Sequence, residues 1–302
     1  MKYLKKFKLF ESLNSKILTE EETINLLKEK CKKFLSNPNA LDGEVIFRKD
    51  EDRGDYLLVN PKQSESSRVS SNVSNFHNLL ISNLDSWQNW PKRNKSLVCA
   101  SYNRAFTHNP SWTRNYAHYV VIPFDTTKVA TGDRNDFWIC FGKLPNRYAW
   151  RDDNSGRPSL PLYLKSLFRD LGYVHSTREL DKETGLWYDK FNELRLDINW
   201  NELKSFLESA QMTDALIEKY FKVKSDLVWN NNLNLLENLN ILLDPVRNKF
   251  KLGDVNSTMK LYSKLDQEAN YDRAGLESWM EDECIMIKPQ LLHSILVDLK
   301  IR

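Results

Sequence analysis

The chain has 302 residues, of which 41% are hydrophobic and 12% aromatic, and this composition excludes a disordered protein and allows a sizeable core. Its 44 Lys and Arg residues against 41 Asp and Glu give a net charge of +3, too balanced to indicate nucleic-acid binding by charge alone. No apolar run reaches the length of a membrane span. We expect one large domain, or one domain with a subdomain.

The cysteines Cys31, Cys99, Cys140 and Cys284 are scattered, with no C-x-x-C pair and no histidine at ligand spacing. This pattern disfavours a zinc site or a disulfide framework and is typical of a protein in a reducing cytosol. We therefore expect no metal. The first twelve residues alternate lysine with apolar residues and lack the apolar centre of a secretory signal, which favours a peripheral helix.

The first expected element is a helix over residues 19–35. It opens on the capping box Thr19-Glu20-Glu21-Glu22, has apolar residues at helical spacing, and ends at Pro38. Residues 44–48 then read as a strand that finishes on Arg48, followed by a charged turn.

Residues 72–84 carry apolar side chains at helical spacing and predict a short helix. Three compact β-rich runs follow, each bounded by turn residues, and we expect three strands. They cover residues 96–101, 119–123 and 137–141.

From residue 161 to residue 267 the apolar spacing is mainly helical, and β-character returns only at 276–279 and 284–287 before a final helix that opens on Pro289. The expected fold class is α+β, with helices segregated from the sheet. The expected organisation is an N-terminal helical segment at 1–40, a β-rich core at 41–155 and 270–302, and a mainly helical insertion at 156–269.

The stretch from residue 66 to 101 holds polar side chains that are poor core material and suit the cradle of an anion or a ribose. Its loop residues are Arg68, Ser70, Asn72 and Asn75, and an ordinary helix N-cap explains them equally well. Ser101 ends a strand, where a serine without a function is at least as common.

Arg48 stands at a predicted strand end, where its guanidinium could fork onto a phosphate, although a surface arginine paired with an acidic neighbour is the commoner case. Glu277, Glu281 and Glu283 stand before or within the last strand pair. A carboxylate there could accept a ribose hydroxyl and stabilise a developing oxocarbenium ion, but a solvated acidic turn is the simpler interpretation.

The order of these residues is more informative than any one of them. An Arg on the first strand, Cys99-Ala100-Ser101 on a middle strand and a Glu-x-Glu on a late strand resembles the Arg–Ser–Glu layout of the ADP-ribosyltransferases, with only the last hydroxyl of the middle motif kept. The N-terminal sequence is similar to the leaders of large tailed-bacteriophage proteins.

The resemblance implies a split, mixed or antiparallel β core that binds NAD as a substrate. Arg48 and the loop residues would bind NAD, Ser101 would buttress the site, and Glu281 would activate the acceptor. The essential carboxylate would be Glu277 or Glu283. These residues would converge on one cleft, with the loop on its rim. The stretch of 235 residues between Arg48 and Glu283 (283 − 48) departs from compact members of the family.

Three hypotheses follow. The first is a mono-ADP-ribosyltransferase that modifies a host protein or nucleic acid in the host cytoplasm during phage infection. The second is a non-enzymatic virion component or inhibitor that contacts other phage proteins and keeps the fold. The third, ranked last, is a nucleic-acid-binding module. Its basic and aromatic residues would be Trp87, Trp90, Lys92, Arg93 and Lys95.

Overall fold

The structure is a computed structural model, and it describes residues 14–37, 45–64, 76–101, 116–134, 136–145, 158–173, 178–180, 187–189, 199–267 and 276–299. The chain divides into two compact units. Unit 1 comprises Met1–Arg68, Trp90–Asp136 and Phe250–Arg302, and unit 2 comprises Val69–Asn89 and Phe137–Lys249.

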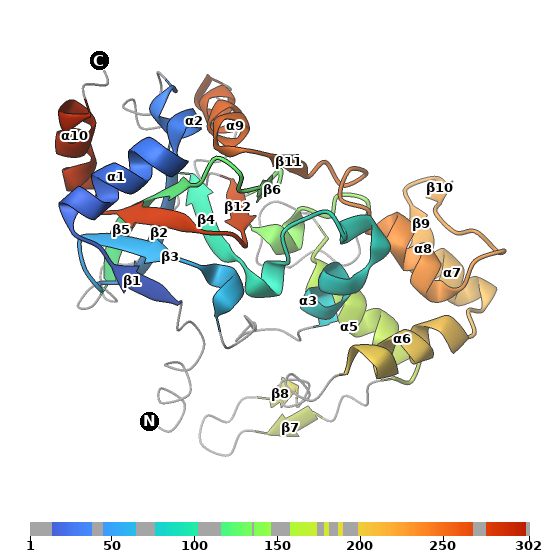
Figure 1. The fold of residues 1–302 in the computed structure, drawn as a ribbon. Helices are drawn as coiled ribbons and strands as arrows, with labels where there is room; N and C mark the ends of the chain where they lie inside the picture. The colour runs from blue at the N-terminus through green and yellow to red at the C-terminus, as the bar shows by residue number, and fades with distance from the viewer. Residues whose placement is uncertain are drawn as a thin grey trace. The chain divides into compact units, whose positions relative to one another are not determined.

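Unit 1 is built on a nine-stranded sheet in which every pairing of the described strands is antiparallel (Figure 1). The strand order is β1-β3-β13-β5-β2-β4-β12-β6-β11. The strands are β1 (Ser15–Ile17), β2 (Ile46–Glu51), β3 (Tyr56–Val59), β4 (Leu97–Ser101), β5 (Tyr116–Pro123), β6 (Val129–Thr131), β11 (Lys251–Gly253), β12 (Glu277–Met280) and β13 (Cys284–Ile287). The expected α+β class with an antiparallel sheet is confirmed.

This sheet cannot be flat, because β12 and β13 are consecutive in the chain yet three strands lie between them in the sheet. Four strand spacings would separate them by about 19 Å in a flat sheet. The four Cα steps from Met280 to Cys284 reach at most about 15 Å. The bend has a visible origin, since β2 pairs with β5 along its whole length but with β4 only at Ile46 and Phe47.

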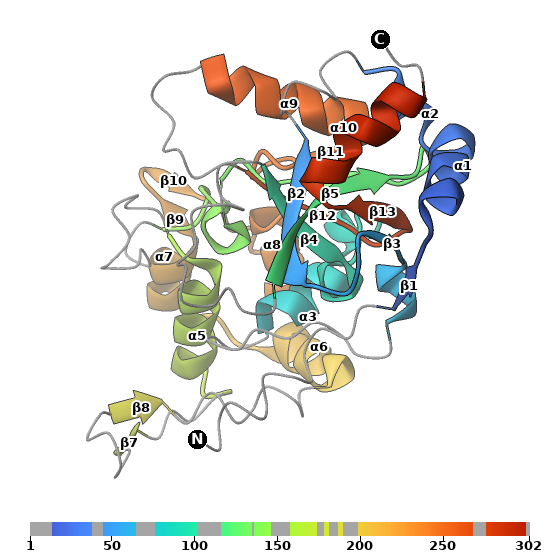
Figure 2. The same ribbon diagram turned by 90° about the vertical axis from the view of Figure 1, so that its left-hand side faces the viewer.

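Four helices of unit 1 lie together on the upper side of the strands in both views (Figures 1 and 2). They are α1 (Glu20–Lys30), α2 (Lys32–Leu35), α9 (Val255–Gln267) and α10 (Pro289–Asp298). Their apolar residues join those of the strands in one buried core. Each of these helices buries apolar side chains, as the helical spacing predicts: the residues Leu27, Phe34, Met259 and Ile295 are at most 1% exposed.

The expected continuous helix over residues 19–35 is broken at Cys31, and this part of the prediction is wrong. The capping box at Thr19 is present as expected, but α1 ends at Lys30 and α2 begins at Lys32. Asp125 stabilises the break, because its carboxylate accepts hydrogen bonds from the backbone N–H groups of Lys32 (3.1 Å) and Lys33 (2.9 Å). The N-terminus of α2 is therefore capped by Asp125, which lies 92 positions from Lys33 in the sequence.

Unit 2 is mainly helical. Its longer elements are α3 (Phe76–Asn83), α5 (Leu160–Asp170), α6 (Trp200–Ser209), α7 (Asp214–Phe221) and α8 (Leu235–Leu242), with two small hairpins, β7 (Arg178–Leu180) with β8 (Trp187–Asp189) and β9 (Lys222–Val223) with β10 (Asp226–Leu227). Phe76 of α3 packs edge-on against Phe168 of α5, with ring centroids 4.6 Å apart. This contact joins α3 to the other helices of unit 2.

The run 137–141, expected as a strand, is not one. Residues Phe137–Ile139 form a 3-10 helix, and Phe137 and Phe141 pack against each other with centroids 5.2 Å apart. Trp87 packs against both rings. An aromatic run of this length can bury its rings from either a strand or a helical turn, and the neighbouring Trp87 favours the turn.

The helical unit differs from the expected insertion at 156–269. It begins at Phe137, ends at Lys249 and includes residues 69–89. Helix α9 was expected at the C-terminal end of the insertion, but it packs on the sheet of unit 1. Its Tyr262 hydroxyl lies 2.7 Å from the Ser278 hydroxyl of β12.

Candidate functional site

The strands that carry Arg48, Ser101 and Glu277 are neighbours in the sheet, in the order β2-β4-β12. Phe47, Ala100 and Glu277 are direct partners across these strands, so their side chains share one face. Arg48 follows Phe47 and points to the other face. The expected convergence of Arg48 and Glu277 on one cleft is therefore wrong.

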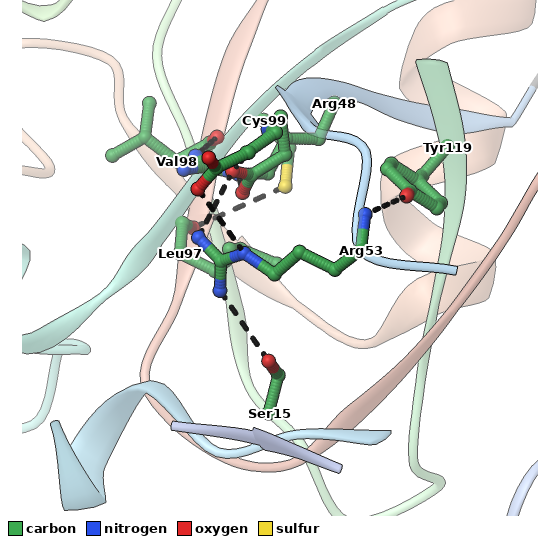
Figure 3. Close-up of polar contacts among 9 residues, drawn as sticks. Ser15, Arg48, Arg53, Leu97, Val98, Cys99 and Tyr119 are labelled. Atoms are coloured by element: carbon green, nitrogen blue, oxygen red, sulfur yellow. Dashed lines mark hydrogen bonds and ion pairs between the residues drawn. The ribbon is translucent and has the colours of Figure 1, made fainter. Parts of the chain in front are cut away.

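The Arg48 side chain is held inside unit 1. Its Nε lies 2.7 Å from an Asp50 carboxylate oxygen, and one terminal nitrogen donates to the Val98 carbonyl oxygen over 2.6 Å (Figure 3). The side chains of Arg48 and Asp50 are each 7% exposed. Strand β2 continues three residues beyond Arg48, which places the residue inside the strand and not at its end.

A second arginine, Arg53, shares the same carboxylate at 3.4 Å and also donates to the Ser15 hydroxyl over 3.3 Å (Figure 3). The Tyr119 hydroxyl accepts from the Arg53 backbone N–H and donates to the Gly54 carbonyl oxygen. Burial raises the pKa of Tyr119, so this hydroxyl stays a donor at neutral pH. These contacts anchor the turn between β2 and β3.

Ser101 extends the pairing of β4 with β12. Its hydroxyl accepts a hydrogen bond from the Leu276 backbone N–H (3.0 Å), while its own N–H donates to the Leu276 carbonyl oxygen (3.1 Å). Ser101 therefore fixes where the strand that carries Glu277 begins. Because Ser101 follows Ala100, its side chain points, like that of Arg48, to the face opposite Glu277, so the expected convergence of Ser101 with Glu277 on one cleft is also wrong.

Glu277 forms a buried ion pair with Arg93. One carboxylate oxygen lies 2.6 Å from an Arg93 guanidinium nitrogen, and both side chains are 7% exposed. The Glu277 backbone is fixed as well, because its N–H donates to Arg134 and its carbonyl oxygen accepts from Gly132. The carboxylate is thus held in one place beside a permanent positive charge.

Glu281 and Glu283 follow in the short connection to β13. The Glu281 carboxylate accepts a hydrogen bond from the Lys92 backbone N–H (2.8 Å) and lies 3.9 Å from the Lys62 ammonium group. Glu283 accepts from the Asn60 side-chain amide over 3.1 Å. Both carboxylates therefore contact segments that precede β4 in sequence, and neither contacts Arg48 by a hydrogen bond.

We name the residues Glu277, Glu281, Lys92 and Arg93 the carboxylate face. Among the described residues this is the place where acidic residues expected from the sequence meet basic groups. The sequence already signalled Lys92 and Arg93 as part of a basic-aromatic patch, but not their link to Glu277. The tryptophans of that patch, Trp87 and Trp90, are 1% and 8% exposed and are not available for stacking on bases.

Other expected residues and groups lie elsewhere. Arg68, Ser70, Asn72 and Asn75 fall outside the described residues. The four cysteines are free and buried, and burial raises the pKa of the Cys31 thiol to about 12, which removes it as a nucleophile. In the described part of the chain, no group of His, Cys, Asp and Glu could hold a metal ion.

Comparison of the chain with known protein families, with curated proteins and with solved structures finds no match. None of the described helices is long and apolar enough to cross a membrane. The functional assignment therefore depends on the geometry above and on the resemblance in motif order.

Proposed function

We propose that the chain is a mono-ADP-ribosyltransferase that cleaves NAD at the carboxylate face and transfers ADP-ribose to a host macromolecule. The observation that carries the proposal is that three strands far apart in sequence, bearing Arg48, Ser101 and Glu277, are neighbours in the sheet. The late carboxylate therefore lies beside the strand of the middle serine, as the resemblance implies, although the side chains of Arg48 and Ser101 both face away from it.

The chemistry of the carboxylate face fits this reaction. When nicotinamide leaves, positive charge grows on the ribose, and a fixed carboxylate stabilises that charge more than it stabilises bound NAD. Glu277 is fixed by its backbone and by Arg93. A guanidinium is also suited to binding a diphosphate, so Arg93 takes the NAD-binding role that was expected of Arg48.

A second candidate function is a non-enzymatic phage protein, either a virion component or an inhibitor. The observation that favours it is that Arg48 and Glu277 are both 93% buried by side chain and already paired with Asp50 and Arg93. Charges buried in pairs are as typical of a structural core as of a reaction site.

Incubation with labelled NAD and a bacterial lysate separates the two functions. The transferase predicts label on a host macromolecule with the wild-type chain, and loss of nearly all label with Glu277→Gln, which keeps the size of the side chain and removes its charge. Asp50→Asn is the matched control, because it removes the charge of a carboxylate that is as buried as that of Glu277 and is likewise paired with an arginine.

Equal labelling by wild type and Glu277→Gln would show that the Glu277 carboxylate has no role in the reaction. If the wild-type chain transfers no label and does not bind NAD, while remaining folded, the second function is favoured.

A further inference from the structure

A short segment of unit 1 covers the strand face that carries Glu277. Three consecutive residues of this segment contact three alternate residues of the chain at β12. The Pro91 carbonyl oxygen accepts from the Trp279 indole N–H (3.1 Å), the Lys92 N–H donates to Glu281, and Arg93 pairs with Glu277. Residues 277, 279 and 281 are two apart, as residues on one face of a strand are.

We name residues 90–95 the strap. Apart from the single 3-10 turn Arg93–Lys95, it has no regular structure, so contacts of its side chains and backbone hold it in place. Lys95 adds one further contact, a hydrogen bond from its ammonium group to the Ser64 carbonyl oxygen over 3.1 Å.

The strap begins where the chain returns from unit 2. Trp90 is the first residue of unit 1 after Asn89, and Phe250 is the first after Lys249. The rings of Trp90 and Phe250 have centroids 6.4 Å apart, and Phe250 lies 5.8 Å from Trp279 of β12. Both returns of the chain into unit 1 are therefore fastened to the same strand that carries Glu277.

We propose that the strap is a cover over Glu277, held shut by the aromatic contact of Trp90, Phe250 and Trp279, and that a pull on either return from unit 2 opens it. The physical reason is continuity: Trp90 and Arg93 are three residues apart, so loosening the Trp90 ring frees the backbone that presents the Arg93 guanidinium. The cover exists whether or not the chain uses NAD, but its effect on catalysis rests on the proposed function.

Chemical labelling of carboxylates tests the cover without NAD. A carbodiimide and an amine modify accessible carboxyl groups, and peptide mass spectrometry gives the rate at each residue. Glu277 should react far more slowly than Glu51, whose side chain is 60% exposed. Phe250→Leu removes the ring that contacts Trp90 and Trp279. It should raise the labelling rate of Glu277 several-fold and leave the labelling rate of Glu51 unchanged.

Phe34→Leu is the matched control. Phe34 is 1% exposed and Phe250 is 3% exposed, so both changes remove a buried ring from unit 1, but Phe34 lies in α2 and in the core cluster to which Trp90, Phe250 and Trp279 do not belong. Equal acceleration of Glu277 labelling in both variants would mean general destabilisation and would overturn the proposal. So would a wild-type Glu277 that reacts as fast as Glu51, or a Phe250→Leu variant with no acceleration.

Parallel measurement of NAD cleavage separates this inference from the proposed function. Faster labelling of Glu277 in Phe250→Leu, together with NAD cleavage by the wild-type chain, supports both. Faster labelling with no NAD cleavage by any variant supports the cover and contradicts the transferase.

Discussion

Two arginines of unit 1 are almost fully buried, and each lies against one buried carboxylate. The pairs Arg48–Asp50 and Arg93–Glu277 both leave 7% of each side chain exposed. Removing one partner of a buried ion pair leaves an uncompensated charge in a medium of low dielectric constant, which is far more costly than losing a surface pair. The two side chains of each pair should therefore contribute to the free energy of unfolding jointly and not independently.

Replacing Arg93 with Met should lower the free energy of unfolding by roughly 3–5 kcal/mol, because Glu277 is left buried without its charged partner. The double variant Arg93→Met/Glu277→Gln should recover part of that loss, since it removes the second charge as well. Urea unfolding followed by circular dichroism measures both values, and additive effects of the two changes would contradict direct coupling.

The surface pair of Lys222 and Glu218 provides the comparison. These residues are four apart at the end of α7, and their side chains are 44% and 65% exposed. Lys222→Met should change the free energy of unfolding by less than about 1 kcal/mol, because an exposed pair is well solvated in both states.

At the scale of elements, the junction of α1 and α2 depends on Asp125. This carboxylate accepts from two backbone N–H groups at the start of α2, which would otherwise lack an acceptor within the helix. Asp125→Ala should cost roughly 1–2 kcal/mol of stability, while Asp125→Asn, which keeps one acceptor oxygen, should cost less. Thermal unfolding of the two variants checks the order.

The start of α9 gives a prediction about pH. Hydrogen bonding from the Ser257 backbone N–H, aided by Lys33, lowers the pKa of Asp254 from 3.8 to about 2. A carboxyl group whose pKa is lowered by folding stabilises the fold above its unfolded pKa, and that stabilisation disappears as the pH falls through the folded pKa.

Wild-type stability should therefore contain a contribution from Asp254 that is complete above about pH 4 and lost by about pH 2. Asp254→Asn should be less stable at neutral pH and should show a smaller decline across that acidic range. Urea unfolding at a series of pH values measures the difference, and parallel curves for the two proteins would contradict the assignment.

Local sequence patterns predicted many of these elements. Strand β13, the Pro289 start of α10 and the Thr19 capping box are confirmed, because each has a strong local signal. The break at Cys31 was not predictable, because its cause is Asp125, which is distant in sequence. Strands such as β3 and β6 were missed, since short runs of apolar residues have no distinctive period.

At the scale of the whole molecule, the order of strands in the sheet was beyond local patterns. Strands β12 and β13 are close to the C-terminal end of the chain, yet each lies in the sheet between two strands that come much earlier in the sequence. The ion pair of Arg93 and Glu277 was not predictable either. The two residues are 184 positions apart in the sequence, and only the sheet order brings them together. From the sequence, Glu277 was expected to act with Arg48, whereas in the structure it forms an ion pair with Arg93.

This topology predicts that unit 1 cannot fold without its last strands. Deletion of residues 276–302 would expose both edges left by β12 and both left by β13, so it should abolish the cooperative unfolding of unit 1. Near-ultraviolet circular dichroism on heating detects this loss. A truncated chain that keeps the wild-type transition would contradict the sheet order.

The central claim is that Glu277 acts on the transition state of NAD cleavage. The most direct measurement is the rate of nicotinamide release from NAD by the purified chain, together with NAD affinity, for wild type and Glu277→Gln. We predict that Glu277→Gln lowers the rate by several orders of magnitude while NAD affinity changes little. An unchanged rate in Glu277→Gln, or a wild-type chain that binds NAD and never cleaves it with any acceptor, would contradict the claim.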